Sequence, residues 1–162
     1  MPLDPQVRVL LDMMKGMPSF SELSPAAARK QTSEMRAMRN AAPAPVANVE
    51  DRKIPGPAGS IPVRIYTPAG SGPFPVLVYY HGGGFVIGDL ESHDGVCRQL
   101  TNGAGCVTVA VDYRLAPEAK FPAAVDDFTQ RRDGFPKTPR TLTPIPIGSQ
   151  SAVIAPAATS PR

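Results

Sequence analysis

The chain has 162 residues, of which 42% are hydrophobic and 19% are charged, and its formal net charge is +3. These fractions are typical of a globular domain and argue against a chain that is disordered throughout. Two cysteines cannot build a disulfide framework, and no apolar run reaches the ~20 residues of a membrane-spanning helix.

Residues 1–45 have the pattern of two helices, which we interpret as an N-terminal helical segment. The first begins at Asp4-Pro5, a capping residue followed by a first-turn proline, and ends near Gly16. Its apolar residues recur at the spacing of one helix face, and these are Val7, Leu10, Leu11 and Met14. The second begins at Ser24-Pro25 and runs through Met38. The apolar start carries acidic residues and no basic leader, unlike a signal peptide, so we expect a cytoplasmic protein.

Residues 46–127 change to the pattern of strands. Two β-like runs, 46–54 and 61–69, flank a turn-rich PGPAGS segment and predict an antiparallel hairpin. Two later runs, VLVYY at 76–80 and CVTVAVDY at 106–113, are apolar on both faces, as strands of a covered parallel sheet are.

The segment between these two apolar runs predicts a helix. Ser92 is its expected cap, Val96 and Leu100 share one face, and Gly103 is its expected end. Strand, helix and strand together form a parallel βαβ unit. A further helix is expected to begin near Phe121.

Residues 128–162 have no helical or alternating period and are rich in proline, so we expect an unstructured tail. The tail holds five basic residues and one acidic residue, whereas residues 1–127 hold 12 basic and 13 acidic ones. The positive charge therefore lies in the tail, and no basic patch interleaved with aromatic residues predicts nucleic-acid binding. A chain that ends its folded part at 127 would leave strand edges uncovered and is expected to be prone to aggregation.

The segment Tyr80-His81-Gly82-Gly83-Gly84-Phe85 directly follows the apolar strand 76–80. Consecutive glycines let the backbone turn sharply and present N–H groups without obstruction. N–H groups held ~3 Å from a developing oxyanion stabilise acyl-transfer transition states. This glycine loop after a strand therefore predicts an oxyanion hole of the HGGG type.

HGGGFVIGDLESHD and VAVDYRLAPEAKFPAAVDD resemble the hormone-sensitive-lipase-like family of α/β-hydrolase carboxylesterases. The resemblance covers about residues 1–127 and implies the N-terminal portion of an α/β-hydrolase fold: a helical cap segment (1–45), then a hairpin and a parallel βαβ unit (46–127), followed here by a disordered tail (128–162). It implies an enzyme that needs no cofactor or metal, whose cap shapes an acyl pocket.

The resemblance also assigns roles to individual residues. Gly82 and Gly83 would donate N–H groups to the oxyanion, and Gly84 would shape the loop. His81 and Asp89 would orient the loop. Three further residues would link the loop after the second parallel strand to the core, namely Tyr113, Arg114 and Glu118.

Other titratable residues have structural interpretations. We expect His93 to lie at the surface and Asp126 and Asp127 to be solvated on a helix. Cys97 and Cys106 are expected to be thiols of the core, because they lack a paired histidine and acid at a recognisable spacing.

Serine-based acyl transfer needs a nucleophile, a base and an acid. The sequence has no residue that matches the family pattern for any of these three roles. The nearest imitation of G-x-S-x-G is Gly148-Ser149-Gln150-Ser151-Ala152, with Gln150 at the nucleophile position and no expected strand before it or helix after it. Permitted codons for Gly148 to Ser160, read from the third base, give I-A-I-G-G-D-S-A-G-G-N-L. We therefore hypothesise that the tail is translated out of frame.

The sequence accordingly predicts a carboxylesterase-family chain that acts on short or medium acyl esters when intact, with a small-molecule ester as its partner. This chain alone is expected to be inactive. The alternative is a non-catalytic interaction protein that uses its basic, proline-rich tail. The sequence does not fix the oligomeric state.

Overall fold

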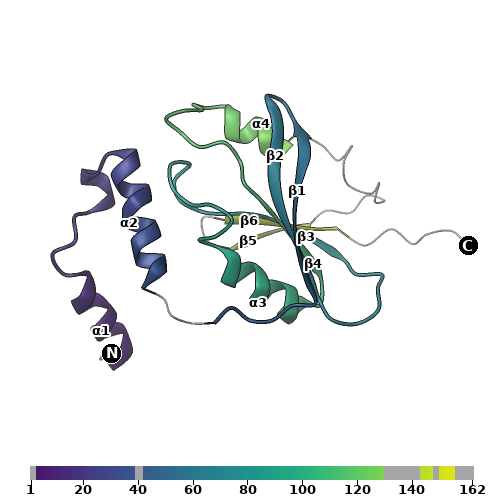
Figure 1. Ribbon diagram of the computed structural model, residues 1–162, viewed down its shortest axis with the longest axis horizontal. Helices are drawn as coiled ribbons and strands as arrows, with labels where there is room; N and C mark the ends of the chain where they lie inside the picture. The colour runs from purple at the N-terminus through teal and green to yellow at the C-terminus, as the bar shows by residue number, and fades with distance from the viewer. Residues whose placement is uncertain (1–2, 39–41, 130–142, 148–149, 156–162) are drawn as a thin grey trace, which may run out of the picture.

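The computed structural model describes residues 3–38, 42–129, 143–147 and 150–155 (Figure 1). Its helices are α1 (Pro5–Met14), α2 (Pro25–Ala37), α3 (Asp94–Ala104) and α4 (Ala123–Thr129), with a short 3-10 turn at Phe20–Glu22. Its strands are β1 (Asn48–Gly56), β2 (Gly59–Thr67), β3 (Val76–Tyr80), β4 (Val107–Val111), β5 (Thr143–Ile147) and β6 (Gln150–Ala155). They form one sheet in the order β1-β2-β4-β3-β6-β5.

The two N-terminal helices begin where their caps predict. The Asp4 carboxylate accepts a hydrogen bond from the N–H of Gln6 at 2.8 Å, and the Ser24 hydroxyl accepts one from Ala27 at 3.3 Å. The apolar face of α1 is not buried, because Val7, Leu11 and Met14 are 45%, 48% and 40% exposed. Both helices stand beside the sheet rather than on one of its faces (Figure 1).

The hairpin prediction is confirmed. β1 and β2 pair antiparallel along their whole length, from Asn48 opposite Thr67 to Gly56 opposite Gly59. The two strands are joined by a two-residue turn at 57–58, which is tighter than the six-residue break expected from the sequence. β2 continues the sheet by pairing antiparallel with β4.

The parallel βαβ unit is also confirmed, with β3 parallel to β4 and α3 between them in sequence. The helix boundary differs from the prediction: Gly105, in the left-handed region at φ +57°, ends α3, and Gly103 lies within it. The buried face also differs. Val96 is 43% exposed, whereas Cys97 and Thr101 are fully buried.

The core has two layers, one on each face of the sheet. On one face Val63, Val109 and Val111 pack with Ala124 of α4. On the other, Tyr66, Tyr79 and Ala110 pack with Cys97 of α3. Alternate residues of β4 thus enter opposite layers, as period-two side-chain alternation requires. Figure 1 shows α3 and α4 on the two sides of the sheet. None of the described helices has the length and apolarity needed to cross a membrane.

Two strands lie in the region expected to be unstructured. β6 pairs antiparallel with β3, and β5 pairs with β6 at the edge of the sheet. The expected uncovered strand edges are therefore paired in the structure, β4 between β2 and β3, and β3 between β4 and β6. A strand edge presents free backbone donors and acceptors that a β-prone run such as SAVIA can satisfy. The rest of residues 130–162 lies outside the described residues.

Candidate active site

The glycine loop after β3 is held by its own backbone. The carbonyl of Gly83 accepts hydrogen bonds from the N–H groups of Val86 and Ile87 at 3.1 and 3.0 Å. Gly83 has φ +134°, and a Cβ there would overlap the carbonyl of Ile87. Gly84, at φ +60°, and Phe85, at φ 62°, continue the turn in the left-handed region. Gly83 therefore has a steric reason to be glycine.

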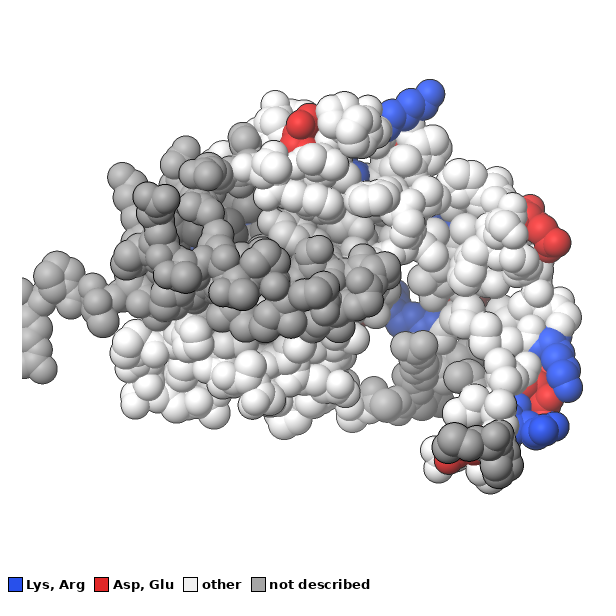
Figure 2. Space-filling model, turned by 180° about the vertical axis from the view of Figure 1, so that it is seen from behind, with Lys and Arg blue, Asp and Glu red and all other residues white. Residues whose placement is uncertain are grey.

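Within the described residues, no hydrogen bond uses the N–H groups of Gly82, Gly83 or Gly84. Gly82 and Gly83 line a cavity of about 370 Å³ together with Ile87, Gly88, Ser92 and His93. The other wall of this cavity comes from the N-terminal segment, through Phe20, Thr32, Met35 and Arg36. Figure 2 shows an open gap between the N-terminal helices and the rest of the molecule over part of their length.

His81 is a buried residue that contacts the backbone of the glycine loop. It is 5% exposed, and its Nδ1 lies 3.0 Å from the carbonyl of Gly82. Because a carbonyl only accepts, Nδ1 is the donor and Nε2 is the unprotonated nitrogen of the neutral ring. Nε2 has no hydrogen-bond partner among the described residues. Burial lowers the pKa of His81, which favours this neutral form.

Tyr113 joins the loop after β4 to the loop after β3. Its hydroxyl donates to the carbonyl of His81 at 2.6 Å, and its ring stacks on the imidazole with centroids 4.3 Å apart. Burial raises the pKa of Tyr113 to about 12, so the hydroxyl keeps its proton. The linking role that the resemblance implies for Tyr113 therefore has a direct contact behind it.

Asp89 acts on the turn that leads into α3. Its carboxylate accepts from the N–H of Ser92 at 2.6 Å, and its own N–H donates to the Ser92 hydroxyl at 2.9 Å. The Ser92 hydroxyl lies 3.0 Å from Nδ1 of His93. Asp89 thus orders residues 89–93, while no direct hydrogen bond to His81 is present among the described residues.

The predicted surface position of His93 is wrong. Its ring stacks on His81 with centroids 5.4 Å apart, lies 5.9 Å from Tyr79, and is partly buried. Burial and the neighbouring His81 lower the pKa of His93. The sequence pattern at the start of a helix does not show which residues from other parts of the chain will pack against it.

The predicted solvation of Asp127 is also wrong. This residue is 3% exposed, and its carboxylate accepts from the backbone N–H of Arg114 at 3.0 Å and from its guanidinium at 2.8 Å. Asp126, one position earlier on α4, is exposed as predicted. The hydrogen bond to Asp127 raises the pKa of Arg114.

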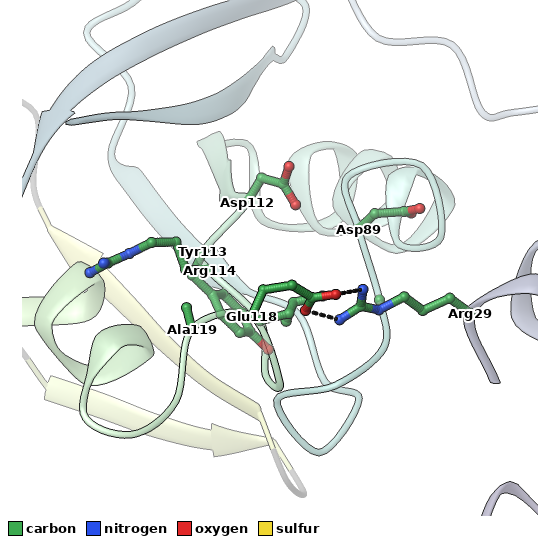
Figure 3. Close-up of a pocket in the computed structure, with 9 residues that line it drawn as sticks. Arg29, Asp89, Asp112, Tyr113, Arg114, Glu118 and Ala119 are labelled. Carbon is green, nitrogen blue, oxygen red and sulfur yellow. Dashed lines mark hydrogen bonds and ion pairs between the residues drawn. The ribbon is translucent and has the colours of Figure 1, made fainter. Parts of the chain in front are cut away.

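A second cavity, of about 670 Å³, is lined by Arg29, by Gly88 and Asp89, and by residues of the segment 112–119 (Figure 3). Arg29 and Glu118 form a two-bond ion pair across it, and Asp89 and Asp112 lie beside this pair. The hydrogen bond from Arg29 lowers the pKa of Glu118 to about 2. Burial, with a smaller contribution from Asp89, raises the pKa of Asp112.

No group of three or more His, Cys, Asp or Glu side chains among the described residues could hold a metal ion. Cys97 and Cys106 are buried free thiols, as predicted. Burial raises the pKa of Cys97 to about 12, so it is not a thiolate nucleophile near neutral pH.

Gln150 begins β6, and β5 precedes it. The presence of a strand before the Gly148–Ala152 segment differs from the prediction, but a second strand follows where an elbow would need a helix. This part of the chain therefore does not form a nucleophile elbow in the described residues.

The known proteins that this chain resembles in sequence include several esterases. Residues 77–132 match a family model described as alpha/beta hydrolase fold. Carboxylic ester hydrolase LipN of Mycobacterium tuberculosis is 50% identical over 97 residues, which are 59% of this chain and 26% of LipN. An arylesterase of Saccharolobus solfataricus is 37% identical over 130 residues, 78% of this chain and 42% of that protein.

Solved structures give the same result. An ester hydrolase from the metagenome of Lake Arreo is similar with a TM-score of 0.70 and 45% identity, over 78% of this chain and 42% of the other. The hyperthermophilic esterase of Pyrobaculum calidifontis has a TM-score of 0.66 at 45% identity, over 78% and 40% of the two chains. The chain thus spans less than half the length of these relatives.

Proposed function

Because the chain belongs to the hormone-sensitive-lipase-like family of α/β-hydrolase carboxylesterases and carries an N-terminal portion of their fold, we propose that residues 81–88 are the oxyanion-binding part of a carboxylic-ester hydrolase. The observation that carries the proposal is that Gly82 and Gly83 lie at a cavity wall and that their N–H groups have no hydrogen-bond partner in the described part of the chain. The substrates would be small-molecule esters with short or medium acyl chains.

In this mechanism the ester carbonyl oxygen lies against Gly82 and Gly83. As the carbonyl carbon becomes tetrahedral, the oxygen gains negative charge, and two prearranged N–H donors stabilise it. Loss of one such donor typically costs about 3 kcal/mol of transition-state stabilisation. The hydrogen bonds within the loop, and the support from His81, mean that little reorganisation accompanies the reaction.

A serine nucleophile, a base that takes its proton and an acid that orients the base are required for an acyl-enzyme mechanism. Ser92 and His93 line this cavity 3.0 Å apart, but the Ser92 hydroxyl donates to the backbone carbonyl of Asp89, and no carboxylate among the described residues is hydrogen-bonded to His93. His81 is unsuited to be the base, because its unprotonated Nε2 is buried, the residue does not line the cavity, and burial lowers its pKa. We propose that the 162-residue chain is inactive by itself.

The proposed cause is a reading-frame change after about Asp127. The gene's nucleotide sequence tests it directly: a second frame encoding G-D-S-A-G beyond Asp127 is expected. The alternative function, a non-catalytic interaction protein with a basic tail, predicts that no such frame is present. A cytoplasmic location is part of our proposal, supported by the two unpaired buried thiols.

The activity test compares two proteins. The chain with the second frame restored is expected to hydrolyse a short-chain 4-nitrophenyl ester, and the 162-residue chain is not. Replacement of the restored elbow serine by alanine is the matched control and should abolish the activity. Hydrolysis by the 162-residue chain, or no hydrolysis by a folded restored chain, would contradict the proposal.

A further inference from the structure

We propose that Arg29 of α2 is a positioning residue for the glycine loop, acting through the carbonyls of two loops rather than on the substrate. This inference rests on the proposed oxyanion role of residues 81–88. Arg29 donates from Nε to the carbonyl of Val86 at 2.8 Å and from its guanidinium to the carbonyl of Ala116 at 2.8 Å. One side chain of the N-terminal segment thus holds both loops.

The contact at Val86 reaches the glycine turn directly. The N–H of Val86 donates to the carbonyl of Gly83, so the guanidinium and Gly83 bind the two ends of the same residue. The contact at Ala116 closes the junction, because the N–H of Ala116 donates to the carbonyl of Phe85 at 2.8 Å. The loop segment 83–86 is therefore fixed from α2 and from the loop after β4.

Glu118 holds the guanidinium in the orientation that these bonds need. Its two carboxylate oxygens accept from two nitrogens of Arg29, each at 2.8 Å, as the dashed lines in Figure 3 show. The Glu118 side chain is 65% exposed, so the ion pair as such contributes little stability. Its effect is on geometry. The two bonds to Glu118 fix the plane of the guanidinium group, and its remaining N–H donors then point at the carbonyls of Val86 and Ala116.

Arg36 provides a matched comparison on the same helix. It lies two turns after Arg29 and pairs with Glu91 at 3.6 Å. No hydrogen bond joins Arg36 to a loop carbonyl among the described residues. Both arginines therefore connect α2 to the rest of the chain by an exposed ion pair, but only Arg29 also binds the backbone around the glycine loop.

The test is amide hydrogen exchange of the full 162-residue chain, read at Val86 and Ile87, whose N–H groups bind Gly83. Amides of Val109 and Ala110 in β4 report global opening. Arg29→Ala is expected to accelerate exchange at Val86 and Ile87 about tenfold or more, the effect of losing one charge-assisted hydrogen bond, without changing β4. Arg36→Ala should leave all four rates unchanged.

Two milder variants keep the test decisive if Arg29→Ala unfolds the chain. Glu118→Gln should accelerate loop exchange less than Arg29→Ala, because the carbonyl bonds remain. Arg29→Lys should be intermediate, because an ammonium group can reach one carbonyl but not hold the fork. Equal loop rates in the Arg29 and Arg36 variants, or equal acceleration in β4 and the loop, would overturn the proposal. Exchange needs no turnover, so failure of the esterase assay is a separate result.

Discussion

The carboxylate of Asp127 is buried against Arg114, accepting hydrogen bonds from both its backbone N–H and its guanidinium. This pair joins α4 to the loop that follows β4. Tyr113, the preceding residue, donates in turn to the carbonyl of His81. The end of α4 is thereby connected through two adjacent residues to the start of the glycine loop.

We expect Asp127→Asn to lower the free energy of unfolding by about 2 kcal/mol, because a buried acceptor of charged hydrogen bonds becomes a neutral amide. Asp126→Asn, at the exposed neighbouring position, should change it by less than about 0.5 kcal/mol. Urea unfolding followed by circular dichroism measures both. Equal effects of the two substitutions would show that Asp127 is not the structural partner of Arg114.

Alanine substitutions at Gly84 and Gly83 are expected to differ in their cost in stability, because only Gly83 has backbone atoms in the space that a Cβ would occupy. Gly84 has a left-handed φ and open space around it, so Gly84→Ala should cost about 1 kcal/mol of stability. Gly83→Ala also forces a Cβ into the carbonyl of Ile87 and should cost about 3 kcal/mol or more, because backbone has to move. Thermal unfolding of both variants measures the two costs. A larger loss of stability in Gly84→Ala than in Gly83→Ala would contradict the prediction.

Tyr113→Phe removes the 2.6 Å bond to the His81 carbonyl and keeps the ring stacking. The expected loss is about 1–2 kcal/mol, since a buried carbonyl loses its donor. Tyr80→Phe is the control, because the Tyr80 hydroxyl makes a longer 3.3 Å bond to the carbonyl of Phe128. Chemical denaturation should rank Tyr113→Phe as the more damaging of the two.

Stability should fall as the pH decreases from about 7.5 to 5.5. The pKa values of His81 and His93 are lowered in the folded state, so the unfolded chain binds more protons once the pH falls through the ordinary histidine value of about 6.5. The lowered pKa of Glu118 adds its loss only below about pH 4.5, whereas the raised pKa of Asp112 acts in the opposite sense.

The measurement is the urea midpoint across that pH range. His93→Gln should make the slope shallower by removing one of the two groups. A midpoint that does not change between pH 7.5 and 5.5 would mean that neither imidazole is held neutral by burial.

Both cysteines should be unreactive in the folded chain. Cys97 is fully buried with a pKa of about 12, and Cys106 is buried with a raised pKa. A disulfide-exchange reagent such as dithionitrobenzoate should label neither thiol within minutes at pH 8 and both in denaturant. Rapid native labelling of Cys97 would contradict the packing of α3 on the sheet.

Local signals in the sequence predicted local structure well. The caps at Asp4 and Ser24, the turn that closes the first hairpin, and the two apolar strands each depend on residues close in sequence. The glycine loop was found for the same reason, because its conformation is written in consecutive residues. Its proposed role as an oxyanion hole stays a prediction.

Contacts between distant residues were not visible in the sequence. Arg29 and Glu118 are 89 positions apart, and no periodicity links them. Asp127 is buried in contact with Arg114, and His93 is partly buried against His81, whereas their polarity alone predicts exposure. β6 was missed because pairing depends on the free edge of β3 as much as on the sequence that occupies it.

The prolines of β5 affect how the molecule meets other copies of itself. β5 is the last strand of the sheet, and Pro144 and Pro146 alternate along it opposite Val153 and Ser151. Proline has no N–H, so these positions fit the side of the strand that faces away from β6 and offer no donors there. At the other edge of the sheet, β1 carries the charged run Glu50 to Lys53, and charged side chains on an edge strand disfavour pairing with a further strand. Both edges of the sheet thus disfavour backbone pairing with a further strand.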